Sequence, residues 1–317
     1  CNKEKYGSLG LVSQVDIVSW VNRIQSLNPE VVGLTLLSTN CFSTLALAKE
    51  LKNIYPQVKI IFGGPEVYRL LGLQMQDLLF AHADFLVIGE GEKNLYKIVY
   101  SLQNKSIIVP TAGIMVKRNN ELLGDIQVNL LGDLDELPFP DYEWFSLDRY
   151  KPKGQLPLLL SRGCTGRCSF CFERLFWRKY RSRSVENIIL EINMAYERYG
   201  VFCFALNDSL MNGNIELLSG FCESIVSKQM DIHWWGMARV DYHMTQGFIE
   251  KLIRSGCQHI AYGIESGSQR VLNLMRKGYV VSLIDRVLLN TVRAGIKPGI
   301  NIMVGYPGEE EGDFLET

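Results

Sequence analysis

Short, strongly apolar runs alternate with amphipathic stretches along the amino-terminal third of the chain. Residues 31–37, 58–62 and 85–88 form the apolar runs, and a helical period of apolar positions separates them, for example over 44–54. Runs this apolar are typical of strands that are buried on both faces of a parallel sheet. The pattern therefore predicts an α/β domain over residues 1–105, with a doubly wound, Rossmann-like parallel sheet.

The pattern changes over residues 106–150. Two strands are predicted around the polar turn 118–121, and Pro138 and Pro140 argue against regular structure in the part that follows. We expect this region to be the connection between two domains.

A second series of strands and helices follows over residues 151–317. Its regular alternation predicts parallel strands joined by crossover helices, as in a (β/α) barrel of the TIM type. Trp234 and Trp235 are adjacent in one predicted strand, so only one of them can line the barrel interior. The predicted strands are 156–161, 201–206, 231–237, 258–264 and 299–305, and the predicted helices are 184–199, 214–229, 245–255 and 282–294.

This barrel is expected to be incomplete. A full eight-stranded barrel takes about 250 residues, whereas about 160 residues follow Leu156. The chain also opens on Cys1 without a methionine. We therefore expect a barrel truncated at its carboxyl terminus and a first domain that lacks its amino-terminal part.

Composition and charge narrow the class of protein. The 317 residues include 33 Lys or Arg and 34 Asp or Glu, so the formal net charge is -1. Without a global positive charge, neither a nucleic acid nor an anionic membrane is an expected partner. No apolar run approaches the roughly 18 residues of a membrane helix and no signal segment is visible, so we expect a cytoplasmic protein without a membrane span.

Three cysteines carry the clearest chemistry in the sequence. Cys164, Cys168 and Cys171 lie directly after the first predicted barrel strand, with small residues between them. Eight cysteines are too few for a disulfide framework in a chain of this length, which favours metal binding. A [4Fe-4S] cluster takes four ligands, so three thiolates leave one iron open for another ligand.

A zinc ion and a cluster that only transfers electrons are the alternatives. Zinc would require a fourth Cys or His ligand. Cys203, Cys222 and Cys257 lie in or beside apolar periodic stretches, and we expect them to belong to the core.

The spacing of the three cysteines, with Phe170 before the last one, resembles that of the radical S-adenosylmethionine (radical SAM) superfamily. The resemblance implies that Cys164, Cys168 and Cys171 hold a [4Fe-4S] cluster whose fourth iron is chelated by the amine and carboxylate of S-adenosylmethionine (SAM). One electron then cleaves SAM to a 5′-deoxyadenosyl radical, and a flavodoxin- or ferredoxin-like protein is the implied electron donor. By the same analogy Phe170 lies against the adenine.

Further segments match the superfamily at the carboxyl ends of predicted barrel strands, where barrel enzymes keep their active sites. Glu265 can accept hydrogen bonds from the ribose or the methionyl ammonium, and Arg239 can pair with the carboxylate. A strand-end ion pair or a helix cap is the structural alternative for Arg239 and Asp208. The resemblance implies a SAM-binding set of Phe170, Asp208, Arg239, Glu265, Ser266 and Gly305.

Residues 1–105 resemble the cobalamin-binding domain that precedes the barrel in one branch of the superfamily. Small or polar residues follow each predicted strand, and small residues let a backbone approach the nucleotide tail of cobalamin. His82 sits at a predicted helix end and is not expected to ligate cobalt. The implied cobalamin-binding residues are Ser38, Thr39, Gly63, Gly64, Glu90 and Gly91.

The resemblance implies a cobalamin-dependent radical SAM enzyme that transfers a methyl group to an unactivated carbon, with oxidative cyclisation as the main variant. Two alternatives stay open: a radical SAM enzyme whose leading domain no longer binds cobalamin, and a non-catalytic iron-sulfur or corrinoid-binding protein. Methylthiotransferases carry three more cysteines in the leading domain, where this chain has only Cys1 and Cys41. The sequence specifies neither the substrate, a small molecule or a peptide, nor the catalytic residues.

Overall fold

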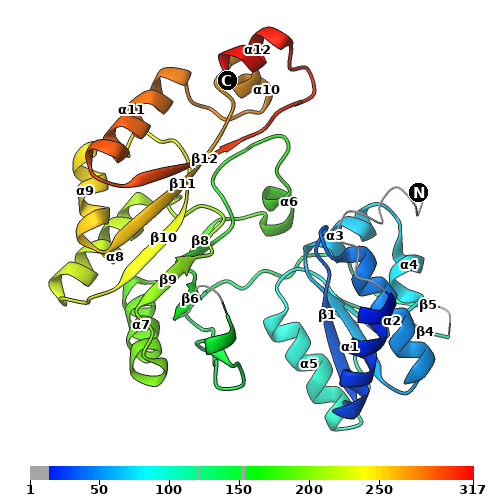
Figure 1. Cartoon of the computed structure of the whole chain (residues 1–317). Helices are drawn as coiled ribbons and strands as arrows, with labels where there is room; N and C mark the ends of the chain where they lie inside the picture. The colour runs from blue at the N-terminus through cyan, green and yellow to red at the C-terminus, as the bar shows by residue number, and fades with distance from the viewer. Residues whose placement is uncertain (1–13, 120, 151–153) are drawn as a thin grey trace. The chain divides into compact units, whose positions relative to one another are not determined.

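The computed structural model describes residues 14–119, 121–150 and 154–317, which divide into two compact units (Figure 1). One unit ends at Leu131, and the other comprises Gly132–Thr317. Each unit contains parallel strands flanked by helices, which confirms the predicted α/β class.

The first unit is built on a five-stranded sheet in the order β1-β2-β3-β4-β5. Strands β1, β2 and β3 are parallel, and β4 and β5 form an antiparallel hairpin beside β3. The three apolar runs of the sequence thus form the parallel part of the sheet, as predicted. The strands are β1 (Val31–Thr35), β2 (Lys59–Gly63), β3 (Phe85–Val87), β4 (Ile114–Arg118) and β5 (Glu121–Gly124).

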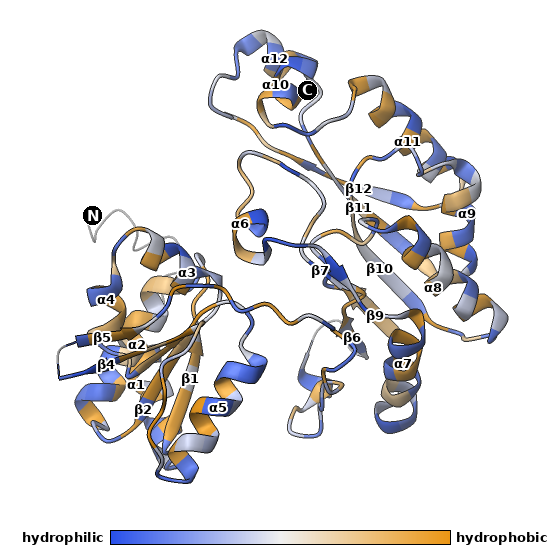
Figure 2. Ribbon diagram, turned by 180° about the vertical axis from the view of Figure 1, so that it is seen from behind, coloured by the Kyte–Doolittle hydropathy of each residue, from blue (hydrophilic) through white to orange (hydrophobic). Residues whose placement is uncertain are grey.

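Helices cover both faces of this sheet. Ile60 and Phe62 of β2 join the core under α1 to α4, whereas Ile61 joins the core on the other face together with Ile98 of α5. All three strand residues are buried, as expected for a central parallel strand. Figure 2 shows the hydrophobic strands between helices with hydrophilic outer faces. The helices are α1 (Gln14–Ser26), α2 (Cys41–Ile54), α3 (Pro65–Gly72), α4 (Gln76–Phe80) and α5 (Glu92–Gln103).

The predicted connection over residues 106–150 is divided between the two units. The β4–β5 hairpin pairs with β3, so the segment up to Leu131 belongs to the first unit. Residue 120, in the predicted polar turn, lies outside the described residues. The part after Leu131 contains only the short 3-10 helix η1 (Leu147–Arg149), in agreement with its prolines.

The second unit contains a five-stranded parallel sheet in the order β12-β11-β10-β9-β6, with a separate hairpin of β7 and β8. All predicted strands are present, although the last one begins at Lys297, where its pairing with His259 starts, rather than at residue 299. The strands are β6 (Gln155–Leu158), β7 (Ser161–Arg162), β8 (Arg181–Ser182), β9 (Cys203–Leu206), β10 (His233–Ala238), β11 (Cys257–Glu265) and β12 (Lys297–Ile302).

Helices pack against one face of this sheet, and the other face carries smaller or exposed side chains. Trp234 is 1% exposed in the helix-side core, whereas Trp235 is 36% exposed, so the two point to opposite faces as predicted. The main helices are α7 (Val185–Tyr199), α8 (Ile215–Ser227), α9 (Gln246–Arg254) and α11 (Val281–Arg293), and the short ones are α6 (Glu173–Trp177), α10 (Gln269–Leu274) and α12 (Glu311–Glu316).

Candidate cofactor site

The three motif cysteines share one loop of the second unit. The loop runs from β7 to α6, and the β7–β8 hairpin closes it at its base. Cys164, Cys168 and Cys171 are partly buried and form no disulfide. The Gly166 amide donates a hydrogen bond to Sγ of Cys164 at 3.2 Å, and the Cys171 amide donates one to the Cys168 carbonyl at 3.3 Å. The loop thereby keeps the three thiols within electrostatic range of one another.

Burial and neighbouring groups govern the charge of these thiols. Burial raises the pKa of Cys164 and of Cys171, and the Cys168 thiol raises both further. For Cys164, the Gly166 amide and the Arg239 guanidinium lower the pKa and so oppose burial. Because a thiol must lose its proton to bind iron, these two donors favour metal binding by the loop.

The number of thiols in the loop matches the protein ligands of a [4Fe-4S] cluster with one open iron. In the described ranges 14–119, 121–150 and 154–317, no three His, Cys, Asp or Glu side chains are arranged to hold one metal ion. A cluster binds each thiolate to a different iron, so its ligands stand farther apart than the ligands of one ion. Cys222 and Cys257 lie in the hydrophobic core, as predicted. Cys203, which was predicted to join them, is only partly buried in strand β9.

Arg239 lies beside the cysteine loop, directly after β10. A double hydrogen bond with Asn212 fixes its backbone, with N–O distances of 2.9 Å both for the Arg239 amide and for the Asn212 side-chain amide. The guanidinium lies over the ring of Tyr279, 5.7 Å from the ring centroid. No carboxylate in the described part of the chain pairs with this guanidinium, so it is available to an anionic ligand.

A cavity of about 250 Å³ adjoins the Arg239 side chain. Thr165 of the cysteine loop and Tyr279 both line it, so the cavity lies directly beside the motif cysteines. A small group bound there would meet the guanidinium of Arg239.

Glu265 is the last residue of β11, and Ser266 follows it in the turn. Their side chains differ in whether they are free to bind a ligand. The Glu265 carboxylate accepts no hydrogen bond from the described residues, and its nearest cation is Nζ of Lys277 at 3.7 Å. Ser266 is fully buried, and its hydroxyl bonds that of Thr317 at 2.9 Å and accepts from the Ser268 amide at 3.0 Å. Glu265 is therefore available to a ligand, whereas the side chain of Ser266 shapes the turn.

Tyr306, which was not predicted as a site residue, follows Gly305 and packs against Phe170. The rings of Phe170 and Tyr306 are edge to face, with centroids 6.3 Å apart, and the Tyr306 hydroxyl is 2.8 Å from Oγ of Ser169. Gly305 has a φ of +79°, which favours glycine at this turn. The loop after β12 therefore rests on the cysteine loop. The sequence feature that could have indicated Tyr306 is its position immediately after Gly305, which was predicted to bind SAM.

Asp208 accepts hydrogen bonds from groups at the base of the cysteine loop, rather than forming the ion pair or helix cap that was its structural alternative. It is 2% exposed and accepts hydrogen bonds from the Leu160 amide at 3.0 Å and from the Ser161 hydroxyl. These bonds join the loop after β9 to the base of the cysteine loop. Both carboxylate oxygens are occupied, so its predicted SAM contact would have to displace one of these bonds.

In the first unit, the predicted cobalamin-binding residues lie at or just after the carboxyl ends of β1, β2 and β3. Because these strands are adjacent and parallel, their carboxyl ends bring the three loops to one edge of the sheet. Asn40 closes the first loop, since its Oδ1 accepts from the Leu37 amide at 2.7 Å and its Nδ2 donates to the Thr35 carbonyl at 3.0 Å. The residues at this edge are Ser38, Thr39, Gly63, Gly64, Glu90 and Gly91.

Two of these six residues also have structural roles. Gly64 has a φ of +95°, and a Cβ atom there would lie 2.6 Å from the Leu36 carbonyl oxygen. Glu90 is 6% exposed and accepts a hydrogen bond from the Leu131 amide. His82 lies between α4 and the amino end of β3, at the opposite edge of the sheet.

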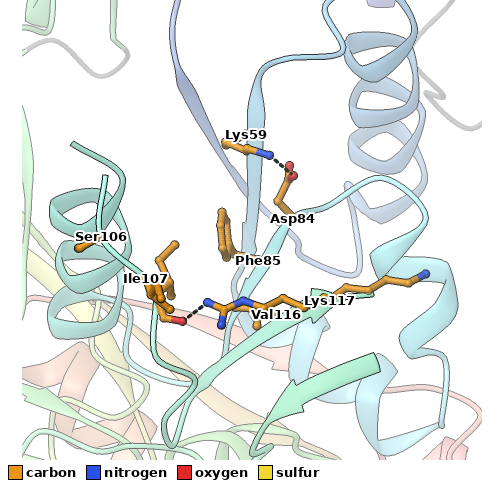
Figure 3. A pocket seen from close by; sticks show the side chains of 9 residues that line it. Lys59, Asp84, Phe85, Ser106, Ile107, Val116 and Lys117 are labelled. Carbon is orange, nitrogen blue, oxygen red and sulfur yellow. Dashed lines mark hydrogen bonds and ion pairs between the residues drawn. The ribbon is translucent and has the colours of Figure 1, made fainter. Parts of the chain in front are cut away.

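A second cavity, of about 460 Å³, lies at that opposite edge. Figure 3 shows the side chains that line it. The first residues of β2 and β3, Lys59 and Phe85, border it together with Arg118 at the end of β4. Nζ of Lys59 is 3.0 Å from Asp84, and the Arg118 guanidinium donates to the Ile108 carbonyl. These charged groups are paired within the protein, and the cavity is separate from the edge of the predicted cobalamin residues.

Across the described residues, no helix combines the length and the apolar character needed to cross a bilayer.

Comparison with protein families gives a match for each unit. The model of the Radical SAM superfamily matches residues 158–317, and the model of the B12 binding domain matches residues 12–99. The first match contains the cysteine loop and the strand ends around Arg239, Glu265 and Gly305, and the second contains the loops after β1, β2 and β3.

Curated relatives include methyltransferases and cyclases. The chain is 27% identical over 312 residues to the Uncharacterized methyltransferase PH0819 of Pyrococcus horikoshii, covering 97% of this chain and 67% of that protein. It is 28% identical over 258 residues to the Anaerobic magnesium-protoporphyrin IX monomethyl ester cyclase of Synechocystis sp., covering 80% of this chain and 50% of that protein. The chain thus spans between half and two thirds of the length of these relatives.

Solved structures with the same fold contain both kinds of unit. The radical SAM methyltransferase TsrM of Kitasatospora setae, with cobalamin and a [4Fe-4S] cluster bound, aligns with a TM-score of 0.73 at 16% identity, covering 93% of this chain and 62% of that one. The cobalamin-dependent radical enzyme OxsB, with aqua-cobalamin and SAM bound, aligns with a TM-score of 0.73 at 19% identity, covering 97% of this chain and 45% of that one. At these identities the likeness establishes the fold.

Proposed function

Because the chain belongs to the Radical SAM superfamily, we propose that it is a cobalamin-dependent radical SAM methyltransferase. Cys164, Cys168 and Cys171 would hold a [4Fe-4S] cluster, and the loops after β1, β2 and β3 would hold cobalamin. When bound, the cluster supplies the electron that cleaves SAM, and cobalamin carries the methyl group to the substrate.

The observation that carries the proposal is the grouping of three cysteines, Arg239 and Glu265 around the carboxyl ends of the strands of one parallel sheet. Three thiolates leave one iron for the amine and carboxylate of SAM. The guanidinium of Arg239 would bind the carboxylate, and Glu265 would accept hydrogen bonds from the ribose or the ammonium. Phe170 is 39% exposed beside the cysteine loop and would lie against the adenine.

The backbone around Arg239 and Asp208 would hold this site in place. Asn212 fixes the end of β10, and Asp208 fixes the base of the cysteine loop through Ser161. These residues therefore act on the geometry of the site, whereas Arg239 and Glu265 would touch the cofactor.

The test is the iron and cobalt content of the protein, purified without oxygen in the presence of hydroxocobalamin. We expect four irons and close to one cobalt per chain, with the absorption of both cofactors. The variant Cys168→Ala should lose the cluster, whereas Cys203→Ala, a cysteine in strand β9, should keep it. A full iron complement in Cys168→Ala would contradict the ligand assignment, and iron without cobalt would favour a leading domain that does not bind cobalamin.

Oxidative cyclisation is the second candidate, because relatives at 28% and 24% identity are named as magnesium-protoporphyrin IX monomethyl ester cyclases. The products separate the two reactions. Methyl transfer converts one SAM to S-adenosylhomocysteine and another to 5′-deoxyadenosine, whereas cyclisation yields 5′-deoxyadenosine without S-adenosylhomocysteine. Formation of neither product under reducing conditions would favour a non-catalytic binding protein.

A further inference from the structure

Lys277 is a buried cation for which the proposed function gives no role. It lies in the turn between α10 and α11 and is 4% exposed. Its Nζ donates a hydrogen bond to the Gly263 carbonyl at 2.7 Å and stands 3.7 Å from Oε1 of Glu265. A buried ammonium is costly unless acceptors and an opposite charge surround it. The pairing with Glu265 therefore explains why a lysine is accommodated here.

Glu265 adopts a backbone conformation that needs support. Its φ of +75° lies in the left-handed region, which residues other than glycine rarely occupy. The pairing of β11 with β12 shifts register between Gly263 and Glu265, and the Glu265 carbonyl accepts from the Met303 amide at 2.9 Å. The strand end is thus irregular at the residue proposed to contact SAM, and such conformations persist where neighbouring groups fix them.

Gly263 leaves the space in which the two charges meet. A Cβ atom at Gly263 would lie 2.9 Å from Oε1 of Glu265 and 3.8 Å from Nζ of Lys277. The Glu265 side chain therefore folds back over Gly263, where the ammonium of Lys277 holds both the carboxylate and the backbone of the same strand.

The turn that carries Lys277 is attached to the cysteine loop. The Ser169 amide donates a hydrogen bond to the Met275 carbonyl at 3.0 Å. The Tyr279 hydroxyl donates to the Ile264 carbonyl at 2.9 Å. Nζ of Lys277 and the guanidinium carbon of Arg239 both lie over the Tyr279 ring, 5.8 Å and 5.7 Å from its centroid. This ring thus links the cation that orients Glu265 to the cation beside the motif cysteines.

From this geometry we propose that Lys277 is a positioning residue, which aims the Glu265 carboxylate at SAM. The inference rests on the proposed function through the assignment of Glu265 to SAM. Lys277 itself would touch neither SAM nor the cluster.

The test is the equilibrium affinity for SAM of the cluster-loaded protein, read from the change in the electron paramagnetic resonance spectrum of the reduced cluster on SAM addition. We expect Lys277→Met to bind SAM on the order of tenfold more weakly, as for other residues that orient a direct ligand. The iron content should remain four per chain. Lys251→Met is the matched control, because it removes a lysine that pairs with Glu223 at the surface, between α8 and α9, and should leave SAM affinity unchanged.

A double-mutant cycle then separates the two assignments. If Lys277 acts through Glu265, Lys277→Met should cost little further affinity in a Glu265→Gln background. Full additivity would overturn the proposal, and so would wild-type affinity in Lys277→Met while Glu265→Gln binds weakly. Wild-type affinity in Glu265→Gln alone would overturn the assignment of Glu265 to SAM, and the positioning role would fall with it.

Gly263→Ala gives a second route if Lys277→Met fails to fold. This variant keeps the lysine and displaces the carboxylate, so it should weaken SAM binding with the cluster intact. Unchanged SAM affinity in Gly263→Ala would contradict the proposal. This variant changes no charge in the core, so its effect does not depend on removing the lysine.

Discussion

Asp208 is a carboxylate whose surroundings set its charge. Burial raises its pKa to about 6, although hydrogen bonds from Ser161 and from backbone amides act in the opposite direction. The ionised form is therefore less favourable in the folded protein than in the unfolded chain. Its neutral form can keep the two bonds that join the loop after β9 to the cysteine loop.

The sign of the resulting pH dependence follows from that raised pKa. Between about pH 4 and pH 6 the folded state holds a proton that the unfolded chain has released, so stability falls as pH rises through this window. The contribution lost is about 3 kcal/mol for a shift of this size. We expect Asp208→Asn to lack this component, so that the variant gains on the wild type by that amount from pH 4 to pH 7.

Urea unfolding of the apoprotein at a series of pH values measures this difference. The variant Asp231→Asn is a control for the loss of a carboxylate, because Asp231 is exposed and takes no part in the hydrogen bonds of Asp208. Parallel pH profiles for wild type and Asp208→Asn would contradict the raised pKa.

The loop from β2 to α3 shows how two adjacent glycines differ. Gly64 has a positive φ and approaches the Leu36 backbone, whereas a Cβ atom at Gly63 would meet only Val87 atoms at 3.9 and 4.0 Å, which is ordinary contact. The loop therefore requires glycine at position 64 for folding. At position 63 folding does not require glycine, so any need for a small residue there would come from a bound ligand.

We expect Gly64→Ala to lower the free energy of unfolding of the first unit by about 3 kcal/mol, because backbone strain and a steric clash combine. Gly63→Ala should change it by less than about 1 kcal/mol but reduce the cobalt retained after purification with hydroxocobalamin. Urea unfolding and cobalt analysis of the two variants test this. Wild-type cobalt retention in Gly63→Ala would place the backbone of Gly63 away from cobalamin.

The elements predicted from the sequence were those whose signal is local. Buried parallel strands give continuous apolar runs, and the helices between them give a regular helical period. The succession of strands and helices along the chain could therefore be predicted. The pairing of β4 with β3 could not be predicted, because the alternation of apolar and polar residues does not specify which strands pair. Lys277 and Glu265 were likewise not connected, because they are brought together by a turn and a strand irregularity rather than by a spacing.

At the scale of the whole chain, the boundary between the units has a measurable consequence. Ile114, Met115 and Val116 of β4 are all at most 8% exposed, and they complete the cores on both faces of the first sheet. A boundary at residue 105, as predicted from the sequence, would remove them and expose Val87 and Ile98 on one face. The boundary at Leu131 keeps both cores intact.

We therefore expect a fragment of residues 1–131 to unfold cooperatively in urea, and a fragment of residues 1–105 to show no cooperative transition. Loss of the hairpin exposes apolar side chains at about 25 cal/mol for each Å² of surface, and a unit of this size has little stability to lose. Far-UV circular dichroism during the titration is the measurement. A cooperative transition in the shorter fragment would mean that β4 and β5 belong to the connection, and cobalamin binding by the longer one would assign that cofactor to the first unit independently of the barrel.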